Sequence, residues 1–409
     1  MGNRAVKLIQ PFAGWRPRPG SAPRVAAPPY DVLSSAEARQ RVAGNPDSFL
    51  HVSKAEINLD PALAPDDDRV YQTARERFEQ MRRTGLLVQD ATPCLYIYRL
   101  AVGQREQVGV VVAASVAAYR DNRIRKHELT RPDKENDRTR LAEALLAHSG
   151  PVFLIHRQTA ELDALVARIR QSAPPDEAFQ ADDGVHHSLW VVRDPGQIES
   201  LVTLFEEQPR LYIADGHHRS AAAARICVTR PAADRFLAVS FPENQLKILD
   251  YNRVVRDLNG LTVPAFLHEV GRRFHLTASV EAVRPDRAHC FGLYVAGQWY
   301  RLELAPEYRD GTDAVTRLDV ALLDRHLLQP VLAIHDLRRD QRIDFVGGIR
   351  GMAALEALVD SGKMAAAFSL FPTQLAELLA VADADQIMPP KSTWFEPKLR
   401  DGLVVQTFD

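Results

Sequence analysis

The spacing of apolar side chains first predicts a helix in the N-terminal third of the chain. From Asp66 to Thr84 apolar residues recur at helical spacing, and Gly85 follows as a stop signal. The apolar face of this predicted helix carries Val70, Ala74, Phe78 and Met81. Two strands follow at 94–100 and 107–116, where β-branched and aromatic residues are enriched. We expect these strands to form a hairpin or an adjacent pair.

Helical and strand patterns then alternate through the middle of the chain. Helices are predicted near 137–147, at 159–171, at 196–206 and from 217, with strands at 151–156, 187–193 and 210–214. This alternation indicates an α/β or mixed α+β layer. Pro, Gly and Asp enrichment predicts an ordered loop or linker at 11–32 and an exposed loop at 172–186.

The C-terminal part of the chain combines strands with later helices. Strands are predicted at 235–241, 246–250, 290–296 and 298–304, and helices near 319–328, 351–361 and 372–381. The fold class we expect is therefore α+β (mixed α/β). Three regions follow from the pattern: an N-terminal α+β region at 1–115, a central α/β domain at 116–240 and a C-terminal α+β region at 241–409.

The composition is that of a globular protein. Lys and Arg total 51 against 53 for Asp and Glu, so no net charge attracts nucleic acid or an acidic membrane surface. Three widely spaced cysteines form no C-x-x-C pair, which indicates a reducing compartment. The polar start is broken by Pro11, which argues against a signal peptide, and no apolar run reaches membrane-spanning length. We expect a cytoplasmic protein that does not contact a membrane.

The segment Ala214-Asp215-Gly216-His217-His218-Arg219 is the strongest chemical signal in the sequence. A short apolar strand precedes it, Gly216 permits a tight turn, and Ser220 begins a helix rich in alanine. The first amides of a helix lack internal partners and attract anions, and His217, His218 and Arg219 add side-chain donors. We predict a phosphate site here. The alternative is a surface turn whose histidines only cap the helix.

A charge-rich segment at 126–138 precedes the central helix. It is either a solvated loop or a second part of the site. His127 and Glu128 are the candidates for a general base or for metal ligands, because both roles need an imidazole or carboxylate near the reacting oxygen.

A proline-stiffened loop at 388–398 contains Lys391, with hydroxyl and aromatic side chains around it. It either closes over a charged ligand, where Lys391 neutralises negative charge, or docks the C-terminal tail. The sequence contains no G-x-x-x-x-G-K-[ST], G-x-G-x-x-G or G-x-S-x-G motif and no H-E-x-x-H pair. The alternative of a metal site stays open for His127, Glu128, Asp215, His217 and His218, but without H-E-x-x-H spacing we assign no residue as a dedicated metal ligand.

Several segments together resemble the bacterial and archaeal family catalogued as domain of unknown function 1015, over nearly the full length. They are Pro28-Pro29-Tyr30-Asp31-Val32, Phe49-Leu50-His51-Val52, Lys126-His127-Glu128-Leu129-Thr130 with Asp137-Arg138, Gly150-Pro151-Val152-Phe153, Ala214 to Arg219, and Lys391-Ser392-Thr393-Trp394-Phe395-Glu396-Pro397.

The turn at 214–219 also resembles, more distantly, the phosphate-binding turn of the ParB and sulfiredoxin-like superfamily. Free-serine kinases in that superfamily carry Asp-Gly-His-His-Arg, as residues 215–219 do, with a His-Glu pair upstream that corresponds to His127-Glu128. The resemblance implies a ParB/sulfiredoxin-like fold for the central domain at 116–240. It implies transfer of a phosphoryl group from ATP or ADP, with Mg²⁺, to the hydroxyl of free serine or a similar small metabolite.

In the implied mechanism Glu128 takes the hydroxyl proton. Gly216, Ser220 and the helix amides hold the phosphates with His217, His218 and Arg219, while Asp215 places Mg²⁺ or orients a histidine. The alternatives are a non-catalytic sensor of a nucleotide or phosphorylated metabolite, and a ParB-like protein that binds a nucleotide or DNA. The charge balance argues against DNA, and His217 replaces the reactive cysteine of sulfiredoxins. The sequence assigns no oligomeric state.

Overall fold

The computed structural model describes residues 7–408, which form two compact units. The first unit consists of 7–126, 130–246 and 397–408, and the second consists of 127–129 and 247–396. The first residues of the polar start, for which the sequence predicts no signal peptide, lie outside the described residues. Within 7–408, no helix combines the length and the apolar character needed to cross a membrane.

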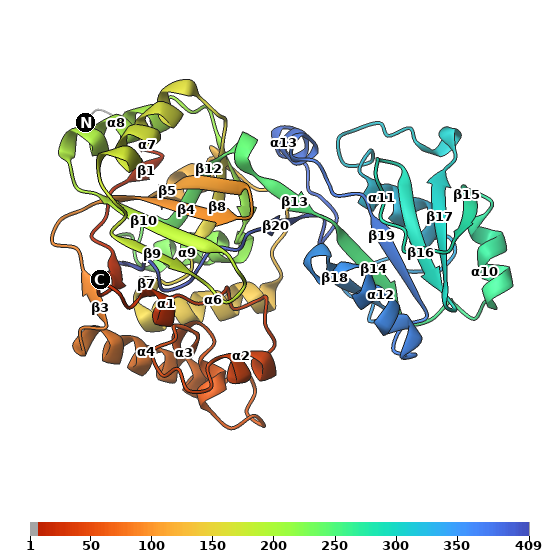
Figure 1. Cartoon of the computed structure of the whole chain (residues 1–409), viewed down its shortest axis with the longest axis horizontal. Coiled ribbons are helices and arrows are strands. Elements are labelled where there is room, and N and C mark those ends of the chain that lie inside the picture. The colour runs from red at the N-terminus through yellow and green to blue at the C-terminus, as the bar shows by residue number, and fades with distance from the viewer. Residues whose placement is uncertain (1–6, 409) are drawn as a thin grey trace. The chain divides into compact units, whose positions relative to one another are not determined.

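A nine-stranded mixed sheet forms the centre of the first unit (Figure 1). In spatial order its strands are β6 (Ile124–Arg125), β11 (Leu211–Asp215), β8 (Val152–His156), β12 (Arg235–Pro242), β5 (Arg105–Ser115), β4 (Leu95–Val102), β10 (His186–Val192) and β9 (Glu177–Gln180), with β1 (Ile9–Gln10) also paired to β5. The pairs β6–β11 and β8–β12 are parallel and the other pairs are antiparallel.

The two faces of this sheet are covered differently. Alternate side chains such as Ile97 and Leu154 share a core with the helices α7 (Ala160–Ser172) and α8 (Pro195–Glu206). Side chains on the other face of the sheet, such as Tyr98, line a small cavity together with Leu403 of the C-terminal segment. This is the period-two pattern of a strand that is buried on both faces.

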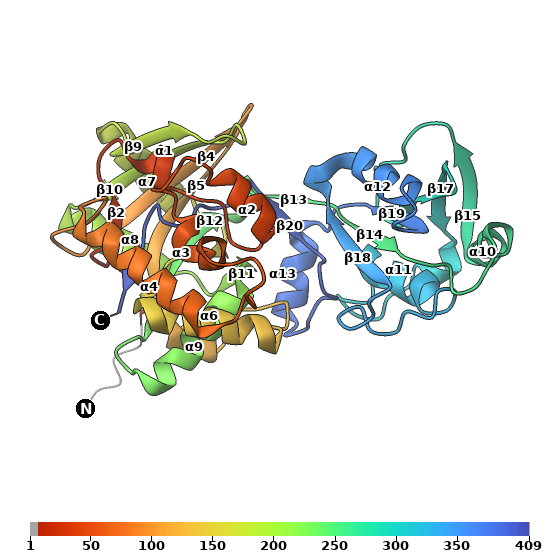
Figure 2. The same cartoon turned by 90° about the horizontal axis from the view of Figure 1, so that it is seen from below.

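A second helical layer packs beside the sheet. Its helices are α1 (Ala22–Val25), α2 (Ser35–Arg41), α3 (Leu50–Ser53), α4 (Asp68–Arg83) and α6 (Pro132–Leu145), with the 3-10 helix η1 (Ala55–Asn58). The helices α5 (Val116–Arg120) and α9 (His217–Thr229) also place Val116, Ala118 and Ala223 in the core shared with α7 and α8. In both views α6 lies between α4 and α9 (Figure 1, Figure 2). Leu141 and Leu145 of α6 join the core that α4 forms with the N-terminal segment.

The C-terminal segment 397–408 returns to the first unit and is fixed there by backbone pairing. Ala27 and Asp401 exchange backbone hydrogen bonds, and so do Trp15 and Val405. β21 (Gln406–Thr407) pairs with β7 (Ala147–His148), while β2 (Trp15–Pro17) pairs with β3 (Leu87–Gln89). The segment that carries Lys398 and Asp401 therefore has a defined place beside the sheet.

The second unit has its own antiparallel sheet. In spatial order its strands are β15 (Phe274–Ser279), β17 (Gln298–Leu304), β16 (Cys290–Val295), β19 (Ala366–Leu370), β14 (Tyr251–Val255) and β18 (Ile343–Gly347). Its helices are α10 (Val263–Val270), α11 (Asp319–Leu323), α12 (Gly351–Asp360) and α13 (Leu375–Asp383), and β13 (Lys247–Leu249) pairs with β20 (Trp394–Glu396).

The predicted α+β class is confirmed, and so are the main elements of the first unit. The helix predicted at 66–84 is α4, and the strands predicted at 94–100 and 107–116 are the antiparallel pair β4 and β5. The segment predicted as a loop at 172–186 contains β9, because its residues pair with β10. Likewise, the segment predicted as a loop or linker at 11–32 contains β2 and α1.

The compact units differ from the three predicted regions. The proposed boundary at 115 falls at the end of β5, whose neighbours β4 and β12 lie on either side of that boundary in sequence. One sheet thus joins strands from the first two predicted regions. Position 240 lies inside β12, and the chain leaves the first unit only after 246. A helix predicted at 319–328 is α11 followed by a π-helical turn from Asp324.

Candidate anion site at the start of helix α9

The predicted strand-to-helix turn is present in the first unit. Strand β11 ends at Asp215, and Gly216 adopts φ 95° and ψ 27°, in the left-handed region that favours glycine. The helix α9 then begins at His217 and runs to Thr229. A thirteen-residue helix concentrates partial positive charge at its first amides, so the turn has the backbone geometry that attracts an anion.

Gly216 also leaves the space that the Arg219 guanidinium occupies. A Cβ atom at position 216 would lie 2.9 Å from Arg219 Nε and 3.0 Å from Arg219 Nη2. The guanidinium therefore folds back over the turn, where Nη1 donates a hydrogen bond to the carbonyl oxygen of Pro151 at 2.6 Å. The turn and the arginine form one arrangement, because a larger residue at 216 would displace the guanidinium.

Asp215 is held between two cations. Its Oδ2 lies 3.2 Å from Lys398 Nζ, and its Oδ1 lies 3.6 Å from Arg219 Nη2. Burial on its own would raise the pKa of Asp215, but Lys398 and Arg219 hold that pKa well below its usual range. Burial likewise opposes the charge of Arg219, yet the carboxylates around it raise the pKa of the guanidinium. The Asp215 carboxylate and the Arg219 guanidinium are therefore both charged at neutral pH.

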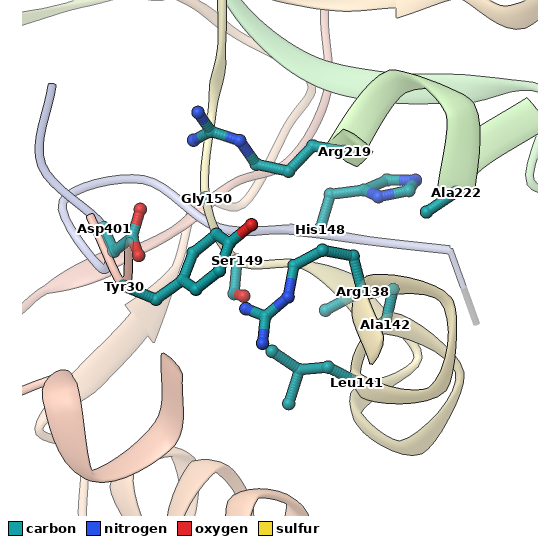
Figure 3. A pocket seen from close by; sticks show the side chains of 11 residues that line it. Tyr30, Arg138, Leu141, Ala142, His148, Ser149, Gly150, Arg219, Ala222 and Asp401 are labelled. Atoms are coloured by element: carbon teal, nitrogen blue, oxygen red, sulfur yellow. The ribbon is translucent and has the colours of Figure 1, made fainter. Parts of the chain in front are cut away.

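A small cavity lies beside Arg219 and has a volume of about 30 Å³ (Figure 3). Its polar lining comes from four separate segments and includes Tyr30, Arg138, Arg219 and Asp401. A water molecule needs roughly 10–15 Å³ of such space, so the cavity accepts a group of a few heavy atoms. It is too small for a whole nucleotide.

Arg138 is positioned by its neighbours on one side of this cavity. Its Nε donates to Asp137 Oδ2 at 2.9 Å, and its guanidinium carbon lies 3.7 Å from the centroid of the Tyr30 ring. Asp137 is fixed in turn by the hydroxyl of Tyr71, which donates to its Oδ1 at 2.8 Å. Burial raises the pKa of Tyr30, so this phenol remains a neutral donor.

Two predicted phosphate ligands of the turn have other contacts, and a third is buried. His218 Nε2 accepts a hydrogen bond of 3.0 Å from the backbone N–H of Arg131, at the start of α6, so this nitrogen does not donate to a phosphate. Ser220 is fully buried, and its hydroxyl donates to the carbonyl oxygen of His217 at 3.0 Å. We therefore remove the Ser220 side chain from the proposed ligands. His217 is also buried.

The remaining predicted residues belong to the second unit. His127 and Glu128 fall in the short segment 127–129, and the carbonyl oxygen of His127 accepts a hydrogen bond of 2.8 Å from Met388. Lys391 has its ammonium 5.6 Å from the centroid of the Tyr251 ring, within the same unit. In the first unit the ammonium beside the turn is that of Lys398, the last residue of the predicted loop at 388–398, although the sequence assigns a role of its own only to Lys391.

The described residues do not provide a ready Mg²⁺ site. Within 7–408, no group of three or more His, Cys, Asp or Glu side chains could hold a metal ion. Asp215, the predicted Mg²⁺ ligand, already lies against Lys398 and Arg219. A metal ion there would have to displace the Lys398 ammonium, so Asp215 does not fit this role. Mg²⁺ in phosphoryl transfer is commonly carried by the nucleotide phosphates and water.

Four side chains around the site have no role in the sequence prediction: Tyr30, Arg138, Lys398 and Asp401. A signal was nevertheless present for two of them. Tyr30 and Arg138 lie in segments that carry the family resemblance, and those segments converge on the cavity with Gly150 and Arg219. Lys398 ends the predicted loop at 388–398, whereas Asp401 carries no signal in the sequence, and both belong to the C-terminal segment that returns to the first unit.

A comparison with solved structures finds matches of low sequence identity and low TM-score. A free serine kinase variant in complex with AMP is 11% identical, with 70% of this chain and 87% of that chain covered and a TM-score of 0.37. SbnI with a C-terminal truncation, from Staphylococcus aureus, is 11% identical, with 71% and 85% covered and a TM-score of 0.38. A conserved hypothetical protein from Pyrococcus furiosus is 14% identical, with 73% and 95% covered and a TM-score of 0.36.

A family model matches most of the chain. Its description is "Protein of unknown function (DUF1015)", and it matches residues 9–321. The match includes Tyr30, Arg138 and the turn at 215–219, whereas Lys398 and Asp401 lie beyond it. A search of curated proteins gives no significant match. This chain is a member of the DUF1015 family.

Proposed function

We propose that this protein is a nucleotide-dependent phosphotransferase that acts on the hydroxyl of free serine or a similar small metabolite. The observation that carries the proposal is the position of Arg219, which folds back over Gly216 at the N-terminus of α9, with Lys398 on the other side of Asp215. Helix amides and two cations at one turn form a site for a phosphate group. The Asp-Gly-His-His-Arg sequence of the turn resembles that of free-serine kinases.

The reaction needs few chemical groups from the protein. The substrate hydroxyl oxygen attacks the terminal phosphorus of ATP or ADP, the bond from that phosphorus to the bridging oxygen breaks, and ADP or AMP leaves. Phosphoryl transfer of this kind depends on positioning and on charge stabilisation more than on covalent chemistry. Arg219, Lys398 and the first amides of α9 supply positive charge, and the nucleotide brings Mg²⁺ with its phosphates.

Glu128 is the base in this proposal and takes the hydroxyl proton, with His127 beside it in sequence. The assignment rests on the His-Glu pair and not on a distance. Glu128→Gln is therefore the decisive variant, because it keeps the shape of the side chain and removes its basicity. We expect it to bind nucleotide like the parent protein and to lose turnover.

The experiment incubates the purified protein with Mg²⁺, serine and either ATP or ADP, and detects O-phosphoserine by mass spectrometry. We expect O-phosphoserine from the parent protein and none from Glu128→Gln. No product from the parent protein would exclude serine as the substrate, and a panel of other small hydroxyl compounds would then test the wider proposal.

One observation favours a second function. Asp215 is paired with Lys398 and Arg219, so it is not available to a metal ion. A non-catalytic sensor of a nucleotide or phosphorylated metabolite needs the anion site but neither a metal ligand nor Glu128. Nucleotide binding without turnover of any hydroxyl compound in the panel would support the sensor.

A further inference from the structure

The cavity beside Arg219 contains one carboxylate oxygen without a hydrogen-bond partner. Asp401 lines this cavity with Tyr30, Arg138 and Arg219 (Figure 3). Its side chain is 3% exposed, and its Oδ1 has no hydrogen-bond partner among the described residues. Such an oxygen is costly, because a buried polar atom has lost its contacts with water. A donor that enters the cavity and binds this oxygen would offset that cost.

The position of Asp401 is fixed by the fold. Its backbone N–H donates to the carbonyl oxygen of Ala27 at 2.9 Å, and the backbone N–H of Ala27 donates to the carbonyl oxygen of Asp401 at 3.0 Å. The carboxylate also needs Gly150 as its neighbour, since a Cβ atom at 150 would lie 2.7 Å from Asp401 Oδ1. The backbone of Asp401 is therefore held in place, and its Oδ1 lies directly against Gly150.

The cations near Asp401 are engaged elsewhere. Arg138 donates to Asp137, and Arg219 donates to the carbonyl of Pro151 and faces Asp215. Within residues 7–408, no cationic side chain makes an ion pair with Asp401. A buried carboxylate in this situation is stabilised either by a proton or by a cation from a ligand.

The electrostatic environment of Asp401 agrees with this view. Burial raises the pKa of Asp401 to about 7, and Asp31 acts in the same direction, while Arg219, Arg138 and the Ser53 hydroxyl only partly oppose them. The carboxylate is thus poised to ionise when a positive group enters the cavity. An added oxyanion would oppose that ionisation, whereas an ammonium group favours it.

We propose that Asp401 recognises the ammonium group of an amino-acid substrate, through a hydrogen bond from that group to its unpartnered Oδ1. This inference rests on the proposed phosphotransferase function and assigns a specificity-determining residue to it. The site then prefers a hydroxyl-bearing amino acid to the hydroxy acid of the same shape. The ammonium enters the cavity, which has room for only a few heavy atoms, and the hydroxyl remains outside it.

The test compares two ligands that differ at one group. O-phosphoserine carries an ammonium where 3-phosphoglycerate carries a hydroxyl, and both have a phosphate and a carboxylate. Calorimetry on the full chain should give at least about tenfold tighter binding of O-phosphoserine, as expected for a hydrogen bond to a charged group. Asp401→Asn should abolish this preference, whereas Asp66→Asn, at an exposed aspartate of the same unit, should keep it.

The two ligands test the role of Asp401 and the phosphate site separately. Equal binding of the two ligands by the parent protein would overturn the role of Asp401 and leave the phosphate site intact. Binding of neither ligand would count against the phosphate site itself. The comparison on the parent protein decides the matter even if Asp401→Asn does not fold. A preference that survives in a folded Asp401→Asn protein would also overturn the inference.

Discussion

Asp215 Oδ2 and Lys398 Nζ lie 3.2 Å apart, although 183 positions separate the two residues in sequence. This ion pair ties the end of strand β11 to the C-terminal segment, outside the part of the chain that the family model matches. It also keeps an ammonium next to the first turn of α9. The pair therefore connects the stability of the first unit to the charge of the proposed phosphate site.

Replacing Lys398 by Gln should weaken both properties. The change removes the Lys398 ammonium and leaves the Arg219 guanidinium beside Asp215. We expect the free energy of unfolding at neutral pH to fall by about 1–3 kcal/mol. Because the pKa of Asp215 is depressed in the folded protein, this contribution is present above the unfolded pKa and fades as the pH falls. Urea unfolding of the parent protein and of Lys398→Gln at several pH values measures this contribution to the free energy of unfolding. Lys7→Gln, at an exposed lysine, is the matched control, and an equal loss in both variants would contradict the role of the ion pair.

Gly216→Ala should disturb the turn more than a simple backbone effect predicts. The new Cβ would lie 2.9 Å from Arg219 Nε, in addition to the strain of a positive φ. Gly184→Ala is the control, because Gly184 has φ 80° and nothing within 4 Å of the added atom. Strain alone costs roughly 1 kcal/mol. We expect Gly216→Ala to cost more than Gly184→Ala in thermal unfolding and to weaken phosphate binding. Equal effects would show that Arg219 moves aside freely.

Asp401→Asn should change the dependence of stability on pH. The pKa of Asp401 is raised from 3.8 to about 7, so the folded state binds more protons than the unfolded state between these values. The stability of the parent protein therefore falls, relative to Asp401→Asn, as the pH rises from about 4 to about 7. The change is on the order of 4 kcal/mol at most.

Unfolding free energies of both proteins across this range measure the effect, and the difference between them removes contributions from other groups. Asp319 in the second unit also has a pKa raised to about 7 by burial, so the parent protein alone would not isolate Asp401. A difference that does not change with pH would contradict the buried, unpaired state of the carboxylate.

The sequence was sufficient where the determining physics is local. The period of apolar residues located α4, and the strand, glycine and alanine-rich helix around Gly216 predicted the turn that the structure contains. The elements missed from the sequence depend on distant partners. β9 is a strand because it pairs with β10, and β2 is a strand because it pairs with β3.

The same distinction applies to the candidate site. The sequence of the turn was enough to predict Arg219 as a phosphate ligand. Its hydrogen bond to the Pro151 carbonyl could not be predicted, because it depends on how the turn packs against the segment before β8. Asp401 has no local motif and becomes visible only as a buried oxygen without a partner. Glu128 and Lys391 stay predictions, because both belong to the second unit.

Calorimetric titration with ADP tests the phosphate site at the start of α9 most directly. The parent protein should bind ADP, and Arg219→Gln should bind it at least about tenfold more weakly, because the variant loses a charged, two-pronged donor. Arg230→Gln, at an exposed arginine just after α9, should bind ADP like the parent protein. Arg219→Lys keeps the charge and replaces the Gln variant if that variant is unstable. Equal ADP binding by the folded Arg219 variant and the parent protein, or no binding by the parent protein, would contradict the account.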